Sequence, residues 1–218
     1  MSGYIAEAIK SGVRAGLLNS MNAMPAIIQS FDTTNQTVKA QIAIMRIVDG
    51  EDKPYTLLVD IPILLPTVQG FHLTMPIQPE DECLLIFADR CIDNWFTEGG
   101  IQPQMEHRVH HISDGFALIG VNSTPNVIEG YSTDSMVIRN TANDQKITLK
   151  PTGDIDIETT SNVNVTCKQA TVKASTSVTL DTPLTTLTGK LDVKGDVTAP
   201  KLTADSVIGG GKTLETHT

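Results

Sequence analysis

The sequence predicts a mainly β protein with one N-terminal helix, a small β-barrel of the OB type and a β-rod. Apolar residues recur every four positions at the start of the chain, and five or so strand-like runs follow. The last third alternates apolar and polar residues in short repeats. A period near 3.6 indicates helix, whereas a period of two and regularly spaced turns indicate strands. The predicted segments are the helix at 1–23, the barrel at 24–105, a linker at 106–135, the rod at 136–208 and an apex at 209–218.

The N-terminal helix is predicted from a single apolar stripe. Its members are Ile5, Ile9, Val13, Leu17 and Met21. Residues at this spacing lie on one helix face. Gly12 and Gly16 weaken the helix, so we expect its stability to come from docking onto another surface.

The barrel is predicted from runs of strand-forming residues between turns. Residues 26–31 and 37–44 flank a polar turn at 32–35, which indicates a hairpin. Further strands are expected at 55–61, 63–66 and 70–75. The continuous apolar run at 83–87 indicates a buried strand. This number of strands in about 75 residues favours an OB-type barrel.

The rod is predicted from pairs of apolar residues two positions apart. Three pairs are spaced by eight, namely Ile147/Leu149, Ile155/Ile157 and Val163/Val165. Less regular pairs follow at Val172/Ala174, Val178/Leu180, Leu191/Val193, Val197/Ala199 and Leu202/Ala204. So few and mostly small apolar side chains cannot offset the conformational entropy of ordering a single ribbon. A lone ribbon also leaves open strand edges. We therefore predict an obligate homo-oligomer, and a trimer suits a closed prism with one apolar face per chain.

Composition excludes several function classes. The formal charge is −9 and aromatic residues make up 4% of the chain, which opposes phosphate binding and base stacking. We therefore expect no nucleic-acid partner. No secretory signal or transmembrane helix is expected, because there is no suitable apolar run. The three cysteines lack metal spacing, and Cys83 and Cys91 are expected to be buried.

Three motifs carry a resemblance to a known family. The first strand motif is Met24-Pro25-Ala26-Ile27-Ile28 followed by Asp32. A later element is Arg108-Val109-His110-His111-Ile112-Ser113-Asp114-Gly115. The longest motif is Leu84-Leu85-Ile86-Phe87-Ala88-Asp89-Arg90-Cys91-Ile92-Asp93-Asn94-Trp95, preceded by a proline-containing acidic turn. In this order, and with the rod, the chain resembles the central-spike proteins of contractile bacteriophage tails. R-type bacteriocins and type VI secretion machines carry related spikes.

This resemblance implies a homotrimer with an intertwined triple-stranded β-helix as its rod. The barrels would form a collar on baseplate hub or tail-tube proteins. The needle would pierce the bacterial cell envelope when the sheath contracts, with transient contact with the outer membrane. The implied location is the virion, at the tip of the tail baseplate, after synthesis in the host cytoplasm. The implied action is mechanical, so we expect no enzyme activity. The alternative is a trimeric receptor-binding tail fibre or adhesin.

Two clusters in the middle of the chain are candidate sites. The histidines His107, His110 and His111, with Asp114 after them, could hold zinc. The alternative is packing, with Arg108 and Asp114 in structural contacts.

The second cluster contains Asp89, Arg90, Asp93 and Trp95. It could form an acid/base pair beside an aromatic platform. The favoured interpretation is a corner in which Asp89 and Asp93 bind Arg90 and Trp95 covers the barrel end. No catalytic residue is therefore predicted.

The C-terminal tail supplies the predicted metal ligand, and this prediction comes from the resemblance. Spikes of this family often end in a His-x-His pair, and three copies of it hold an iron ion on the threefold axis. Imidazole is a suitable iron ligand. Here the sequence ends Glu215-Thr216-His217-Thr218. Only His217, the first histidine of such a pair, is present, so iron at the apex requires continuation beyond Thr218. The alternative is an unstructured polar tail.

Overall fold

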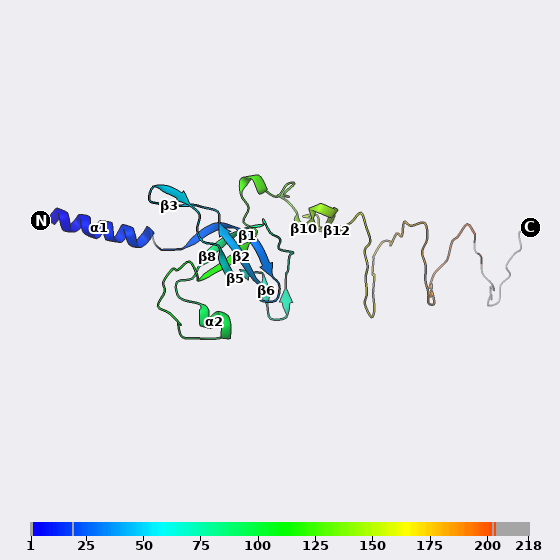
Figure 1. Ribbon diagram of the computed structural model, residues 1–218. Helices are drawn as coiled ribbons and strands as arrows, with labels where there is room; N and C mark the ends of the chain where they lie inside the picture. The colour runs from blue at the N-terminus through cyan, green and yellow to red at the C-terminus, as the bar shows by residue number, and fades with distance from the viewer. Residues whose placement is uncertain (1, 19, 202, 204–218) are drawn as a thin grey trace, which may run out of the picture. The chain divides into compact units, whose positions relative to one another are not determined.

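A closed five-stranded β-barrel forms the main folded unit of this computed structural model, which describes residues 2–18, 20–201 and 203 (Figure 1). The order around the barrel is β1-β2-β5-β9-β8, and β8 closes on β1. The strands are β1 (Ala23–Asp32), β2 (Thr37–Ile42), β5 (Leu58–Leu64), β8 (Glu82–Phe87) and β9 (Gly115–Ile119). The predictions of mainly β structure, a helix at the N-terminus and a small barrel are confirmed.

The first strand closes the barrel because it pairs along both of its edges. Residues 23–27 pair antiparallel with β8, and residues 26–32 pair antiparallel with β2. The β1–β2 register shifts between Ile28 and Ser30, and such a bulge bends a strand and increases its twist. The pair β5–β9 is parallel, whereas β2–β5 and β8–β9 are antiparallel.

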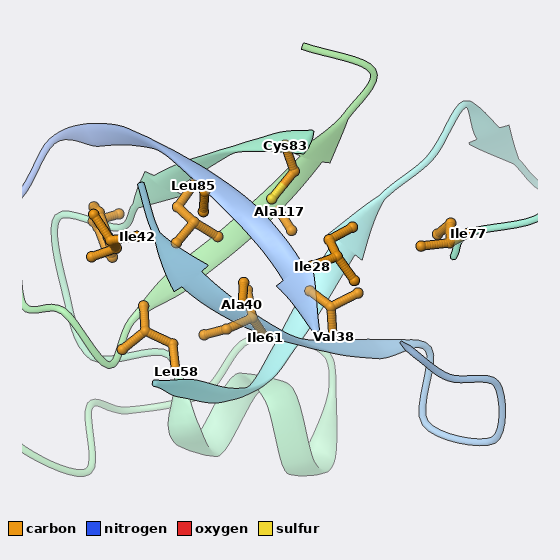
Figure 2. Packing of buried hydrophobic residues seen from close by; sticks show 12 residues of the cluster. Ile28, Val38, Ala40, Ile42, Leu58, Ile61, Ile77, Cys83, Leu85 and Ala117 are labelled. Carbon is orange, nitrogen blue, oxygen red and sulfur yellow. The ribbon is translucent and has the colours of Figure 1, made fainter. Parts of the chain in front are cut away.

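The barrel interior is filled by side chains that alternate along the strands. The labelled side chains that come from the barrel strands converge between those strands in Figure 2, and Ile77 lies apart from them on the segment before β8. The buried cluster contains Ala26, Ile28, Val38, Ala40, Ile42, Leu58, Ile61, Ile77, Cys83, Leu85, Phe87 and Ala117. Positions two apart face the same side of a strand, so the alternation 26/28, 38/40/42 and 83/85/87 explains why these residues form one core.

One part of the sequence prediction needs correction. Strand β9 lies inside the segment 106–135 that we expected to be a linker. It completes the barrel between β5 and β8. Its residues Gly115–Ile119 form a short, nearly continuous apolar run, which lacks the alternation that marks a strand with one solvated face.

Two small hairpins extend from the barrel strands. The first joins β3 (Arg46–Val48) to β4 (Glu51–Lys53), and Asp49 and Gly50 in its turn both have positive φ, at 56° and 80°. This Asp-Gly pair is typical of a type I′ turn. The second hairpin joins β6 (Thr67–Val68) to β7 (Phe71–His72) through Gly70, whose φ is 79°.

The N-terminal helix α1 spans Ser2–Leu18 and is shorter than predicted. Met21, which we assigned to its apolar stripe, packs against the barrel core instead. The Met21 N–H donates to the His110 carbonyl at 3.0 Å. A second helix, α2 (Asp93–Glu98), was not predicted, because six residues are too few to show helical periodicity. The 3₁₀ turns are η1 (Thr124–Asn126) and η2 (Thr141–Asn143).

After the barrel, a three-stranded sheet contains β10 (Met136–Asn140), β11 (Gln145–Leu149) and β12 (Ile155–Glu158). The chain divides into two units, and most residues of the second unit belong to the segment that starts at Glu158. Among the described residues after Glu158, the single chain forms no strand. Of the apolar pairs predicted for the rod, Ile147/Leu149 lies in β11 and Ile155/Ile157 lies in β12. The predicted triple-stranded β-helix is not present in the described part of one chain alone.

Candidate functional site

The most densely connected polar group in the barrel unit surrounds Arg108. Its guanidinium donates to Asp114 twice, from Nε to Oδ2 at 3.0 Å and from Nη2 to Oδ1 at 2.9 Å. Nη2 also reaches Asp93 Oδ2 at 2.8 Å and Cys91 Sγ at 3.1 Å, and Nη1 reaches Glu106 Oε2 at 2.8 Å. The arginine thus joins α2 to the segment before β9.

Asp114 is the buried member of this cluster, with 0% of its surface exposed. It also accepts a hydrogen bond from the Ile92 N–H at 3.0 Å. Burial favours the protonated acid, but the hydrogen bonds from Arg108 and Ile92 and the positive charge of Arg108 outweigh it and hold the pKa of Asp114 below its usual range. These carboxylates raise the pKa of Arg108 in turn. Arg108 and Asp114 therefore form a charged pair at neutral pH, held in place by several hydrogen bonds.

The same cluster resembles a metal site in its ligand types. Ligand atoms of Cys91, Asp93 and Asp114 all lie within 4.8 Å of one another. However, Arg108 Nη2 is within 3.1 Å of an atom of each of these three residues. A fixed cation therefore already lies between these ligands, and the arginine makes the hydrogen bonds that burial of the carboxylate requires.

The three histidines that we considered as zinc ligands do not form a ligand group among the described residues. His110 Nε2 lies 3.2 Å from Asp89 Oδ1, while the His111 Nδ1 accepts from the Ser113 N–H at 3.2 Å. The alternative interpretation of this segment, structural contacts between Arg108 and Asp114, is the one that the geometry supports.

The corner around Asp89 is only partly as expected. Arg90 pairs with Asp89 at 2.8 Å, as predicted. Asp93 pairs with Arg108 instead of Arg90, because the fold brings residue 108 to the start of α2. Trp95 packs against Phe116 of β9 with ring centroids 5.7 Å apart. Two tilted rings at this distance form a favourable aromatic contact.

Sequence reasoning missed an anchor for the segment that leaves the barrel. The Glu82 carboxylate accepts from the Ser123 hydroxyl at 2.6 Å and from the Asn126 amide at 2.8 Å, and it also accepts from the Ser123 N–H. These bonds, the one from the Ser123 hydroxyl above all, hold the pKa of Glu82 below its usual range. The anchor joins residues more than 40 positions apart, so no local motif marks it.

The second unit presents apolar side chains to solvent in the single chain. Ten large apolar residues lie between Thr159 and Lys201, and they are between 45% and 78% exposed. They are Val163, Val165, Val172, Val178, Leu180, Leu184, Leu187, Leu191, Val193 and Val197. Such a concentration of exposed apolar surface indicates an interaction site.

The predicted metal ligand, His217, lies outside the described residues, as does the whole predicted apex at 209–218. Iron binding there stays a prediction. None of the described helices is long and apolar enough to cross a membrane.

Comparison with known families gives two matches. Residues 24–120 match the N-terminal domain of phage protein Gp138, and residues 166–212 match the phage spike trimer family. The first match coincides with the barrel, from the first strand to the end of β9. The second covers eight of the ten exposed apolar residues, from Val172 to Val197, and supports the predicted homotrimer. No curated protein matches the chain.

Proposed function

We propose that this chain, whose two family matches support a phage baseplate central spike protein, forms the homotrimeric needle of a contractile tail. In this proposal the spike is a structural component of the virion tail that pierces the bacterial envelope when the sheath contracts. Its contact with the outer membrane is transient. Its action is mechanical, without a catalytic step.

One observation carries the proposal. The ten exposed apolar side chains between Thr159 and Lys201 have no core of their own in the described part of the single chain. The match to the spike trimer family covers most of this stretch. Three copies wound around one another would bury these side chains and would pair the backbone groups of each strand. We therefore propose that this stretch folds on trimerisation into a triple-stranded β-helix.

A trimeric rod of this kind has the mechanical properties that piercing needs. Each strand would pair with other chains, so separating one chain would break backbone hydrogen bonds along the whole rod. Closure by symmetry leaves no free strand edge along its length. The result would be a stiff, narrow element that concentrates force at its end.

The barrel would attach this rod to the rest of the tail. Its order β1-β2-β5-β9-β8, with one parallel pair, supports our interpretation as an OB-type barrel. The Arg108 cluster and the Glu82 anchor hold the barrel to the segments that follow α2 and β9. Rigid connections of this type would transmit force from hub or tail-tube proteins to the rod.

The experiment that tests this function compares piercing with receptor binding. Host cells are incubated with the purified trimer before the parent particles are added, and particle adsorption is counted. A piercing spike does not compete for adsorption, and a labelled antibody locates it only at the baseplate tip. Saturable binding of the purified protein to cells, with loss of adsorption, would instead establish the receptor-binding alternative.

A further inference from the structure

The hairpin β6–β7 presents an apolar face to solvent in the single chain. Val68 lies directly opposite Phe71 in the hairpin, and these residues are 69% and 76% exposed. Residues directly opposite on an antiparallel pair share one face. The other face is polar, because Thr67 lies opposite His72 and the Thr67 hydroxyl is 2.6 Å from His72 Nδ1. The hairpin therefore has one face suited to water and one that is not.

The surroundings of this face are also apolar. An open hollow of about 580 Å³ is lined mainly by apolar residues of the segments 65–68 and 71–73, and Thr67 and His72 of the polar face also contribute to it. The whole run from Ile61 to Pro79 contains no Asp, Glu, Lys or Arg, although charged residues make up 19% of the chain. Depletion of charge is characteristic of the centre of a protein interface. The partner of this face is therefore expected to be apolar as well.

The other small hairpin of the same barrel provides a direct contrast. In the hairpin β3–β4, five of the eight residues from Arg46 to Lys53 are charged. Its own exposed apolar residue, Ile47, lies opposite Asp52. Charged edges of this type keep a hairpin from pairing with other chains. The lack of charge on β6–β7 is therefore a property of that hairpin and not of all the hairpins in the barrel.

The occupant that fits this face is a second copy of the chain. This step rests on the proposed function, because the rod would hold three barrels at a high effective concentration. A copy of the chain is present as soon as the trimer forms, whereas hub proteins are met only on assembly into the tail. An apolar face left uncovered until then would favour aggregation. Coverage by a neighbouring barrel avoids that exposure.

We propose that the Val68–Phe71 face of each barrel docks onto the neighbouring barrel in the trimer. The hairpin of one protomer meets a different surface of the next. Such a heterologous contact closes into a ring under threefold symmetry. The proposal adds an apolar interface at the barrel level to the one in the rod.

Hydrogen exchange of the intact trimer tests this contact against a monomeric reference. The reference is the Val178→Asp variant, which is expected to be monomeric. Its substitution lies in the rod and leaves the barrel sequence unchanged. The exchange rate of the β6–β7 amides is expected to be lower in the trimer than in the reference by a factor of about ten. The exchange rate of the β3–β4 amides is expected to be the same in both. Equal exchange of β6–β7 in a confirmed trimer overturns the docking proposal but leaves the proposed function intact. A wild-type chain that is itself monomeric overturns both.

Photo-cross-linking gives a second test that does not require a monomeric variant. Phe71 is replaced by p-benzoylphenylalanine in one protein, and Ile47 in a matched control, because these residues are 76% and 77% exposed in the single chain. Irradiation of the full-length protein is expected to join protomers through position 71 and not through position 47. Only intramolecular products at position 71 would contradict the proposal and favour a hub protein as the occupant.

Discussion

Arg108 and Asp114 form a two-point ion pair, with the guanidinium Nε and Nη2 donating to the two carboxylate oxygens at 3.0 and 2.9 Å. Paired donors of this geometry match a carboxylate in a way that a lysine ammonium cannot. The carboxylate is fully buried, and the same guanidinium binds Asp93 at the start of α2. Arg108 thus fixes the segment that leads into strand β9 of the barrel.

We predict that Arg108→Met destabilises the barrel by about 3–5 kcal/mol, because it leaves a buried carboxylate without its partner. Urea unfolding followed by fluorescence of Trp95, the single tryptophan, measures this loss. The matched control is Arg90→Met, which removes the exposed 2.8 Å pair with Asp89 and is expected to cost about 0–1 kcal/mol. Equal effects of the two substitutions would contradict the structural role of Arg108.

The pair also predicts a pH dependence of stability. The pKa of Asp114 is lowered in the folded chain, so its contribution is fully present above the unfolded pKa of about 3.9. The contribution is lost as the pH falls towards the folded pKa. The stability difference between the wild type and Asp114→Asn should therefore be large at pH 7 and should shrink as the pH falls below about 4. A difference that stays constant from pH 7 to pH 3 would show that the charge of Asp114 is not what stabilises the barrel.

Val178→Asp is predicted to prevent assembly of the rod. We place Val178 on the apolar face that turns towards the threefold axis, where three carboxylates would be buried without partners. The expected product is a monomer in solution and in an unheated SDS gel, whereas the wild type resists SDS at room temperature. Thr179→Asp, one position along and on the opposite face, serves as the control and should remain trimeric. A heat-resistant trimer from Val178→Asp would show that the wrong face was assigned to the axis.

The thiols provide a test of the barrel core. Burial raises the pKa of the Cys83 thiol to about 11, so at pH 8 only about one molecule in a thousand carries the reactive thiolate there. Iodoacetamide at pH 8 should therefore leave Cys83 unmodified until the barrel unfolds, as measured by peptide mass spectrometry. Rapid native labelling of Cys83 would contradict the packing shown in Figure 2.

Sequence reasoning was most successful where the pattern is local. The hairpin of β1 and β2 and the buried strand at 83–87 were predicted within a few residues, because alternation and continuous apolar runs report directly on burial. The strand β9 was missed because it is short and follows a stretch rich in histidine. Its pairing with β5, more than 50 positions earlier, has no local signal.

The difference between local and long-range contacts also explains which contacts of the candidate site could be predicted. The contact between Asp89 and its neighbour Arg90 could be predicted from the sequence. Asp93 was assigned to that neighbour as well, but it binds Arg108, 15 positions away. The choice between two arginines depends on the path of the chain through α2 and back to the barrel. Residue types and spacing alone do not determine that path.

Light scattering coupled to gel filtration would show whether three chains form one spike. We expect a solution mass of about three times the 23.5 kDa of one chain, with an early elution position that indicates an elongated particle. A compact species with the mass of one chain would contradict this expectation, because the apolar residues of the rod would then have to be buried within a single chain.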